Sequence, residues 1–187
     1  MTTLTANLLA FPQTDGNFGD LSVAASCAFL AGSRLAFEYR VTGRTDLLRL
    51  PPVVSPRRTE GLWRHTCFES FVAIGDAEYL EFNFSPSGEW AAYAFAGYRV
   101  AAPEPALIAP HIECAVATGG IVLTATIDAA AILAAARSRP VAMNLTAVLE
   151  TQRGARGYFA AHHPAERPDF HDRRGFVLAV DTRGASS

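Results

Sequence analysis

The sequence predicts an all-β protein built as an antiparallel sandwich with one short helix. Many segments of strand length alternate between apolar and polar residues or are apolar throughout. Clusters of Gly, Pro, Ser and Asp separate these segments at short intervals, as turns do. The strands do not alternate with long amphipathic helices, so the β-α-β architecture of parallel sheets is not expected.

The predicted strands share a period of two or a continuous apolar run, bounded by turn-forming residues. They cover residues 3–10, 21–30, 34–41, 67–74, 79–84, 89–95, 111–117, 121–127, 141–151, 157–161 and 176–180. The turn signals between them lie at residues 31–33, 75–76, 85–88, 119–120 and 154. With 187 residues, half of them apolar, the chain can bury one sizeable core, and we expect a single domain over residues 1–187.

Helix-favouring sequence is confined to the stretch DAAAILAAAR, residues 128–137. Its alanines have high helix propensity, and Asp128 can accept hydrogen bonds from the free N–H groups of the first turn. The helix must end before Pro140, whose ring cannot continue it. Two proline-containing segments, residues 45–61 and 103–110, are predicted to be exposed loops.

Residues 78–99, EYLEFNFSPSGEWAAYAFAGYR, are predicted to form a β-hairpin whose two faces differ in chemistry. In its first strand apolar residues alternate with polar ones, so one face packs in the core. The polar face carries Tyr79, Glu81 and Asn83. If residues 85–88 form a four-residue loop, Asn83 lies opposite Trp90, and the indole of Trp90 shares the polar face with Glu81.

The preceding strand, residues 67–74, is predicted to extend this polar face. A three-residue loop at 75–77 places Glu69 close to Asn83. A two-residue loop would instead bury Glu69, which costs several kcal/mol unless the carboxylate is paired. We therefore prefer the three-residue loop, and we expect Trp63, just before the strand, to wall one end of the polar face.

This combination of side chains suits a sugar. The apolar C–H patches of a pyranose lie flat on an indole, and its hydroxyl groups bond to planar carboxylates and carboxamides. An alternative is that Trp90 packs beneath a loop while Glu81 is solvated. The candidate ligand-binding residues are Trp90, Glu81, Asn83, Tyr79, Glu69 and Trp63.

The segments LWRHTCFESFVAI and YLEFNFSPSGEWAAYAFAGYR resemble the DOMON-like proteins, relatives of family 9 carbohydrate-binding modules. The shared pattern is a Trp, a strand around a Glu, a Tyr-x-Glu-Phe strand and a Ser-Pro-x-Gly turn. Near the C-terminus, LET, GYFAAHHP and RPDFHDRRGF are similar to recurring segments of this family. The resemblance spans much of residues 63–180. It implies an immunoglobulin-like β-sandwich domain that binds a ligand, typically sugar or haem, without catalysing a reaction.

Composition and net charge exclude several classes of partner and of chemistry. The net charge is −2 and no basic cluster exceeds a pair of arginines, so no nucleic-acid partner is expected. Lysine is absent, which excludes lysine Schiff-base and P-loop chemistry.

No signal peptide or membrane span is recognisable. The three cysteines, Cys27, Cys67 and Cys114, have the apolar surroundings of buried free thiols, and we expect a cytoplasmic protein that contacts no membrane.

Two alternatives involve a cofactor. Haem could be held by Met143 with His65 or His111, but the neighbours that share the face of Met143 are apolar, which favours packing. A divalent metal could be held in the loop HHPAERPDFHD, although the ligand spacing there matches no standard motif. The candidate ligands in that loop are His162, His163, Asp169, His171 and Asp172. We therefore expect no cofactor.

Two further alternatives concern the predicted polar face itself. Glu69 and Glu81 could act as a carboxylate pair in glycoside hydrolysis. The sequence, however, indicates no apolar pocket that would separate their pKa values, so we expect a binding protein and not an enzyme. An exposed aromatic face could also serve as a protein interface, and the sequence leaves the oligomeric state open.

Overall fold

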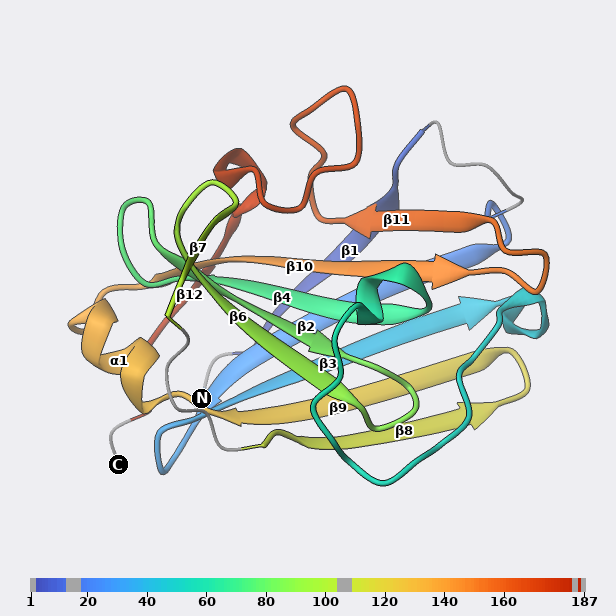
Figure 1. The fold of residues 1–187 in the computed structure, drawn as a ribbon, viewed down its shortest axis with the longest axis horizontal. Helices are drawn as coiled ribbons and strands as arrows, with labels where there is room; N and C mark the ends of the chain where they lie inside the picture. Colours follow the sequence, from blue (N-terminus) through green and yellow to red (C-terminus); the bar gives the residue numbers. More distant parts are fainter. Residues whose placement is uncertain (1–2, 13–17, 104–108, 183–184, 186–187) are drawn as a thin grey trace.

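The computed structural model describes residues 3–12, 18–103, 109–182 and 185, and it folds into two layers of antiparallel strands (Figure 1). The first layer has the order β1 (Leu4–Ala10), β2 (Leu21–Leu30), β3 (Arg34–Gly43), β9 (Gly120–Asp128) and β8 (His111–Ala117). The second has the order β7 (Val100–Ala102), β6 (Trp90–Gly97), β5 (Tyr79–Phe84), β4 (Cys67–Ala73), β10 (Val141–Glu150) and β11 (Arg156–Ala160), and β12 (Leu178–Val180) pairs with β10. Strand β1 joins the layers, because it pairs with both β2 and β11.

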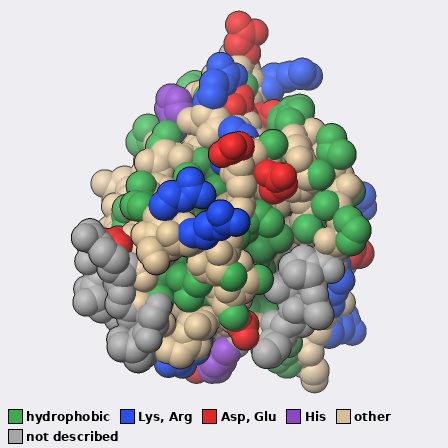
Figure 2. Space-filling model, turned by 90° about the vertical axis from the view of Figure 1, so that its left-hand side faces the viewer, with side chains coloured by type: hydrophobic (Ala, Val, Ile, Leu, Met, Phe, Trp, Pro, Cys, Tyr) green, Lys and Arg blue, Asp and Glu red, His purple; other side chains and the backbone are tan. Residues whose placement is uncertain are grey.

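The predicted all-β antiparallel sandwich with one short helix is confirmed. Among the described residues, α1 (Ala130–Ala136) is the only α-helix, and it lies at one end of the sandwich, where charged side chains of both signs mix with hydrophobic ones (Figures 1 and 2). The carboxylate of Asp128 accepts a hydrogen bond from the N–H of Ala130 at 2.8 Å, as the capping prediction requires. No helix in the described part of the chain is long and apolar enough to cross a membrane.

The predicted strands all exist, with boundaries within two residues of those observed. Strand β7 was missed, because three residues are too few to display a period. The single-turn 3₁₀ helices η1 (Thr45–Leu47), η2 (Leu62–Arg64) and η3 (Arg173–Gly175) were missed for the same reason. The centre of the predicted loop 103–110 lies outside the described residues.

The main hydrophobic core lies between the two layers. Alternate side chains of β3, including Phe37 and Tyr39, meet alternate side chains of β4 and β5 from the opposite layer. The ring centroids of Phe37 and Phe84 are 5.7 Å apart, and those of Tyr39 and Phe68 are 5.0 Å apart. Offset aromatic pairs at these distances contribute roughly 0.5–1.5 kcal/mol beyond the area they bury, so they hold the layers face to face.

Tyr39 adds a polar link between the layers. Its hydroxyl is fully buried and donates a hydrogen bond to the backbone carbonyl of Glu69 at 2.6 Å. Since that bond uses the only hydroxyl proton, Ser70 must donate the second bond, at 2.7 Å, to the Tyr39 oxygen. The link fixes the position of β3 over the segment of β4 that carries Glu69.

Strands β4 and β5 are buried on both faces, although their outer face was predicted to be polar and exposed. The segment 161–177 covers part of that face, with the rings of Phe170 and Phe176 packed against Phe71 and Tyr79. The helix η2 covers another part and packs Leu62 against β4 and β6. The side chains of this face therefore lie under protein and not under water.

The predicted register of the β5–β6 hairpin is wrong by one residue. The N–H of Ser85 donates to the carbonyl of Glu89 at 2.9 Å, so the turn holds an odd number of residues, 86–88, and not four. Phe84 then pairs with Trp90. A shift of one residue exchanges the faces of a strand, so Trp90 packs against the main core and does not share a face with Glu81.

The loop 45–61 holds Glu89 in place as the residue that closes the turn. The Glu89 carboxylate accepts hydrogen bonds from Arg57 and Thr59, both at 2.9 Å. The backbone of this loop also pairs with Trp90. The Trp90 N–H donates to the carbonyl of Arg57, and the Trp90 carbonyl accepts from the N–H of Thr59. The loop is mostly exposed, as predicted, but its contacts hold the start of β6 in the observed register.

The predicted β4–β5 register is confirmed. The N–H of Ile74 donates to the carbonyl of Glu78 at 3.1 Å, which leaves residues 75–77 as the loop, and Glu69 pairs with Asn83. The reason given for this register does not hold, however. It assumed that the register would keep Glu69 in water, whereas its side chain is 3% exposed.

We predict that Tyr39→Phe lowers the free energy of unfolding by about 2 kcal/mol. The substitution leaves the buried Ser70 hydroxyl without its partner and removes the side-chain bond to the Glu69 carbonyl, which together cost roughly 1–3 kcal/mol, while the ring packing is retained. Urea denaturation measures the change. Tyr158→Phe is the matched control, because no described residue forms a hydrogen bond with the Tyr158 hydroxyl and its ring contact with Phe170 is retained, so the change should cost well under about 1 kcal/mol. Equal effects of the two substitutions would contradict the role of Tyr39.

Candidate binding cavity

A cavity of about 380 Å³ opens on the outer face of the second layer. Its floor and walls come from β4, β5, β6, β10 and β11, from η2 and from the segment 161–177. Antiparallel pairing brings these distant segments together, because every second side chain of each strand points outward. The lining residues are Trp63, Glu69, Phe71, Glu81, Tyr93, Phe95, Arg99, Val148, Arg156, Tyr158, Pro168, Phe170 and His171.

Aromatic rings form much of the wall. Trp63 of η2 meets Tyr93 of β6 edge to face, with ring centroids 5.9 Å apart. Further along β6, Phe95 stacks on Tyr79 with centroids 4.7 Å apart, and across the cavity Tyr158 contacts Phe170. The Tyr93 hydroxyl donates a hydrogen bond to Glu60 at 2.7 Å, which keeps the ring in place.

Two buried carboxyl groups lie in the cavity lining. Glu69 of β4 and Glu81 of β5 are diagonal neighbours in the ladder, because Glu69 pairs with Asn83 and Glu81 pairs with Phe71. Such neighbours have Cα atoms about 7–8 Å apart. The side chains of Glu69 and Glu81 are only 3% and 5% exposed. The site thus places two acids close together with little water.

Burial changes the charge of this pair. It raises the pKa of Glu81 to about 7, against the hydrogen bond from Asn83 and the charge of Arg99, which favour ionisation. Burial and then the nearby charge of Glu81 hold the pKa of Glu69 well above its ordinary range. Burial therefore disfavours the ionised form of Glu69, and Glu81 is close to half ionised at neutral pH.

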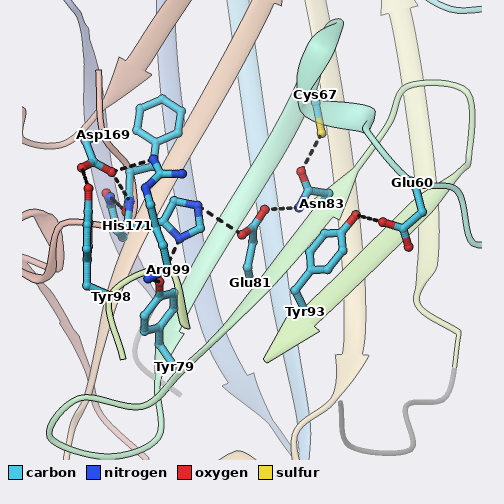
Figure 3. Close-up of polar contacts among 12 residues, drawn as sticks. Glu60, Cys67, Tyr79, Glu81, Asn83, Tyr93, Tyr98, Arg99, Asp169 and His171 are labelled. Atoms are coloured by element: carbon cyan, nitrogen blue, oxygen red, sulfur yellow. Dashed lines mark hydrogen bonds and ion pairs between the residues drawn. The ribbon is translucent and has the colours of Figure 1, made fainter. Parts of the chain in front are cut away.

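The two carboxyl groups differ in their hydrogen bonds. Oε1 of Glu81 accepts a bond from the Asn83 carboxamide at 2.6 Å, and Asn83 in turn accepts one from the Cys67 thiol at 3.5 Å (Figure 3). Glu69, by contrast, has a buried Oε1 with no hydrogen-bond partner. Glu81 is thus held in one orientation, while Glu69 retains unused hydrogen-bonding capacity in the cavity.

Tyr79 and His171 form a hydrogen-bonded pair beside Glu81 (Figure 3). The backbone N–H of Arg99 donates to the Tyr79 hydroxyl at 3.1 Å, and we assign the hydroxyl proton to a bond with Nδ1 of His171 at 2.8 Å. Burial and the charge of Arg99 lower the pKa of His171 to about 4, so the ring is neutral at pH 7. Its proton then sits on Nε2, 3.6 Å from Oε2 of Glu81.

Asp169 anchors the segment 161–177 to the turn between β6 and β7. Its carboxylate accepts hydrogen bonds from the Tyr98 hydroxyl at 2.6 Å, the Arg99 guanidinium at 3.0 Å and the His171 N–H at 3.1 Å. Burial opposes ionisation of Asp169, but the bonds from Tyr98 and Arg99 outweigh it, and the pKa is lowered. Asp169 is therefore an ionised clamp that positions His171.

Five of the six predicted site residues lie together on this outer face, and Trp90 does not. Glu69, Glu81 and Trp63 line the cavity directly. Asn83 and Tyr79 lie behind the lining, where they orient Glu81 and His171. The predicted role of Trp63 as a wall agrees with its position beside Tyr93.

The sequence reasoning missed Tyr93, Phe95 and Arg99 as site residues. Tyr93 and Phe95 alternate with alanine along β6, so a turn with an odd number of residues would have placed both on the face of Glu81. His171 was considered only as a metal ligand. No local pattern indicated that the segment around His171 folds back over β4 and β5.

The cofactor alternatives find little support in the geometry. The described residues contain no group of three His, Cys, Asp or Glu side chains able to hold a metal ion. In the loop considered as an alternative metal site, His163 donates a hydrogen bond to the carbonyl of Leu9, while Asp169 and His171 take part in the cavity network. Met143 is fully buried in the main core, as the packing interpretation expected, with its sulfur 4.0 Å from that of Cys27.

Comparison with known proteins supports the fold. The sequence matches no known protein family and no curated protein. A crystal structure named "putative carbohydrate-binding protein", from Bacteroides uniformis ATCC 8492, superposes with a TM-score of 0.70. The similarity covers 97% of this chain and 87% of that chain, with 15% sequence identity. At this identity the likeness shows a shared fold.

The raised pKa of Glu81 makes stability depend on pH. Between the ordinary value of 4.5 and about 7, the folded protein keeps a proton that the unfolded chain has released, so the free energy of unfolding falls as the pH rises. Glu81→Gln removes this titration. Relative to the wild type, the variant should gain about 3 kcal/mol of unfolding free energy between pH 4 and pH 8, measured by urea denaturation.

Glu113→Gln is the matched control for this measurement. Glu113 lies on β8 with its side chain 75% exposed, so its substitution should leave the pH dependence of stability unchanged. A difference between Glu81→Gln and the wild type that is the same at both pH values would show that Glu81 does not titrate as a buried carboxyl group.

Proposed function

We propose that the protein is a non-catalytic binding module that holds a carbohydrate or sugar-containing metabolite in this cavity. The observation that carries the proposal is the presence of the Trp63 and Tyr93 rings beside the buried, oriented carboxyl group of Glu81. A sugar needs both an apolar surface for its C–H patches and planar polar partners for its hydroxyl groups. The cavity volume also falls in the range of roughly 300–1,000 Å³ usual for small-molecule sites.

Two independent lines support a sugar ligand. The Bacteroides protein that shares the fold is named for carbohydrate binding. The resemblance of residues 63–180 to DOMON-like proteins and family 9 carbohydrate-binding modules points in the same direction, and it is part of the proposal. We also propose that the protein acts in the cytoplasm, where free thiols such as those of Cys27 and Cys67 are stable.

Glycoside hydrolysis is a second candidate, favoured by one observation. The sequence suggested no apolar pocket, but the cavity supplies one, and a pKa of about 7 suits Glu81 to general-acid chemistry. A hydrolase also needs an ionised second carboxylate as nucleophile or base. Burial raises the pKa of Glu69 as well as that of Glu81, so the pair lacks a readily ionised partner and binding is the better-supported function.

The test uses tryptophan fluorescence during titration with monosaccharides and nucleotide sugars. Trp63 is 40% exposed at the cavity wall, whereas Trp90 packs against the main core. A bound sugar should change the emission of the wild type and of Trp90→Phe, but not that of Trp63→Phe. Trp63→Ala should weaken binding by roughly tenfold, through lost stacking, in calorimetric titration.

Two results would count against the proposal. One is the absence of any change in fluorescence or in thermal stability across the full set of sugars. The other is a signal that persists in Trp63→Phe and disappears in Trp90→Phe, which would move the ligand away from this cavity. Release of sugar from aryl glycosides, abolished by Glu81→Gln, would favour hydrolysis instead.

A further inference from the structure

We propose that the ligand of this cavity presents a protonated amine to Glu69 and Glu81, so that an amino sugar binds in preference to its neutral counterpart. The inference rests on the proposed binding function and specifies the class of ligand. It follows from the hydrogen-bonding capacity of the carboxyl pair, from the distribution of charge around the cavity and from the aromatic wall.

The carboxyl groups have more acceptor capacity than the protein uses. Oε1 of Glu69 is buried without a hydrogen-bond partner, although Glu69 lines the cavity. Glu81 accepts one bond, from Asn83, and its other oxygen lies 3.6 Å from Nε2 of His171, beyond a normal hydrogen bond. An ammonium group brings three donors and no acceptor, which matches these unused oxygens better than a hydroxyl with a single donor.

The charged groups around the cavity lie in two places. Glu69 and Glu81 are at its floor, and the Arg99–Asp169 ion pair is at its rim. Arg99 and Arg156 line the cavity, and the charge of Arg99 favours ionisation of Glu81, but among the described residues no arginine forms a hydrogen bond or ion pair with Glu69 or Glu81. The guanidinium of Arg99 is engaged by Asp169 at 3.0 Å. His171, the basic side chain nearest to Glu81, is neutral at pH 7. A cation supplied by the ligand would therefore stabilise the ionised form of the carboxyl pair.

The wall suits a cation as well as a sugar ring. A cation near the face of Trp or Tyr is attracted by the ring quadrupole, by about 0.5–2 kcal/mol depending on its exposure to water. Trp63 and Tyr93 line the same cavity as the carboxyl pair, and Tyr93 is the cross-strand partner of Glu81. Because these rings would also accept a neutral pyranose, the carboxyl pair and not the wall distinguishes the two classes of ligand.

Binding of a cation should release protons. An ammonium beside the pair favours the ionised carboxylates, so below about pH 7 its binding displaces the proton of Glu81. Other titratable or charged groups face the pair from each surrounding element. These are Cys67 on β4, Tyr79 on β5, Tyr93 on β6, Arg99 in the following turn, Arg156 and Tyr158 on β11, and Asp169 and His171 in the segment 161–177.

The experiment compares matched sugars by isothermal titration calorimetry at pH 7. Glucosamine, galactosamine and mannosamine are each measured against the parent sugar and the N-acetyl derivative, whose nitrogen carries no charge. We expect at least one amine to bind at least tenfold more tightly than both neutral partners. Repeating that titration at pH 6 in two buffers of different ionisation enthalpy should give different observed heats, because a proton is released.

Substitutions of Glu69 and Glu81 test whether these two residues cause the preference for the amine. Glu81→Gln and Glu69→Gln should each reduce the ratio of amine affinity to parent-sugar affinity to about threefold or less. Glu113→Gln, at an exposed carboxylate on β8, should leave the preference unchanged. The comparison of amine with parent sugar in the wild type does not depend on how well any variant folds.

Each outcome separates the amine inference from the proposed function. If a neutral or acetylated sugar binds as tightly as its amine, the amine inference is overturned and sugar binding stands. If no sugar binds, the proposed function fails, and cyclohexylamine is then compared with cyclohexanol. Preferential binding of cyclohexylamine, lost in Glu81→Gln, would still support an amine site, whereas equal binding or no binding would overturn it.

Discussion

The burial of strands β4 and β5 on both faces is the constraint on which the rest of this structure depends. A sheet in a two-layer sandwich ordinarily has one face in the core and one in water, and polar residues on the outer face then cost little. Here the segment 161–177 and η2 lie over that outer face, so Glu69 and Glu81 lose most of their solvent. The raised pKa values of Glu69 and Glu81, and the cavity that they line, follow from the packing of this segment and of η2 on the outer face.

The polar network explains how the cover can be stable above two acids. Asp169 remains ionised where donors from Tyr98 and Arg99 reach it, and this bonded clamp sets the position of His171. Glu69 has no comparable donors among the described residues, and burial instead raises its pKa. Neutralisation by protonation is the usual response of a carboxyl group that is buried without a partner. The protein thus keeps its charges at the rim and a nearly uncharged, acidic floor below, which is an arrangement suited to a ligand that brings polar hydrogen atoms.

The aromatic and acidic character of the site was predictable, but its composition was not. Alternation along β5 correctly placed Glu81, Asn83 and Tyr79 on one face, and the three-residue loop correctly placed Glu69 beside them. A turn of four residues would place Trp90 on the same face. The odd turn, closed between Ser85 and Glu89, exchanges Trp90 for Tyr93, so one aromatic residue replaces another beside the acids. An aromatic residue therefore lies beside the acids in either register, because both faces of β6 carry aromatic residues.

The sequence by itself determined the strands, the helix and the side-chain alternation, because these depend on the period of apolar residues and on propensities within a few positions. Only the tertiary structure decided which face of β6 meets the cavity, since the register depends on contacts of Glu89 with Arg57 and Thr59, about thirty residues away. It also decided that Glu69 and Glu81 are buried and that His171 faces them. Those facts depend on where the segment 161–177 lies, and a long-range packing contact leaves no periodic signal in the segments that form it.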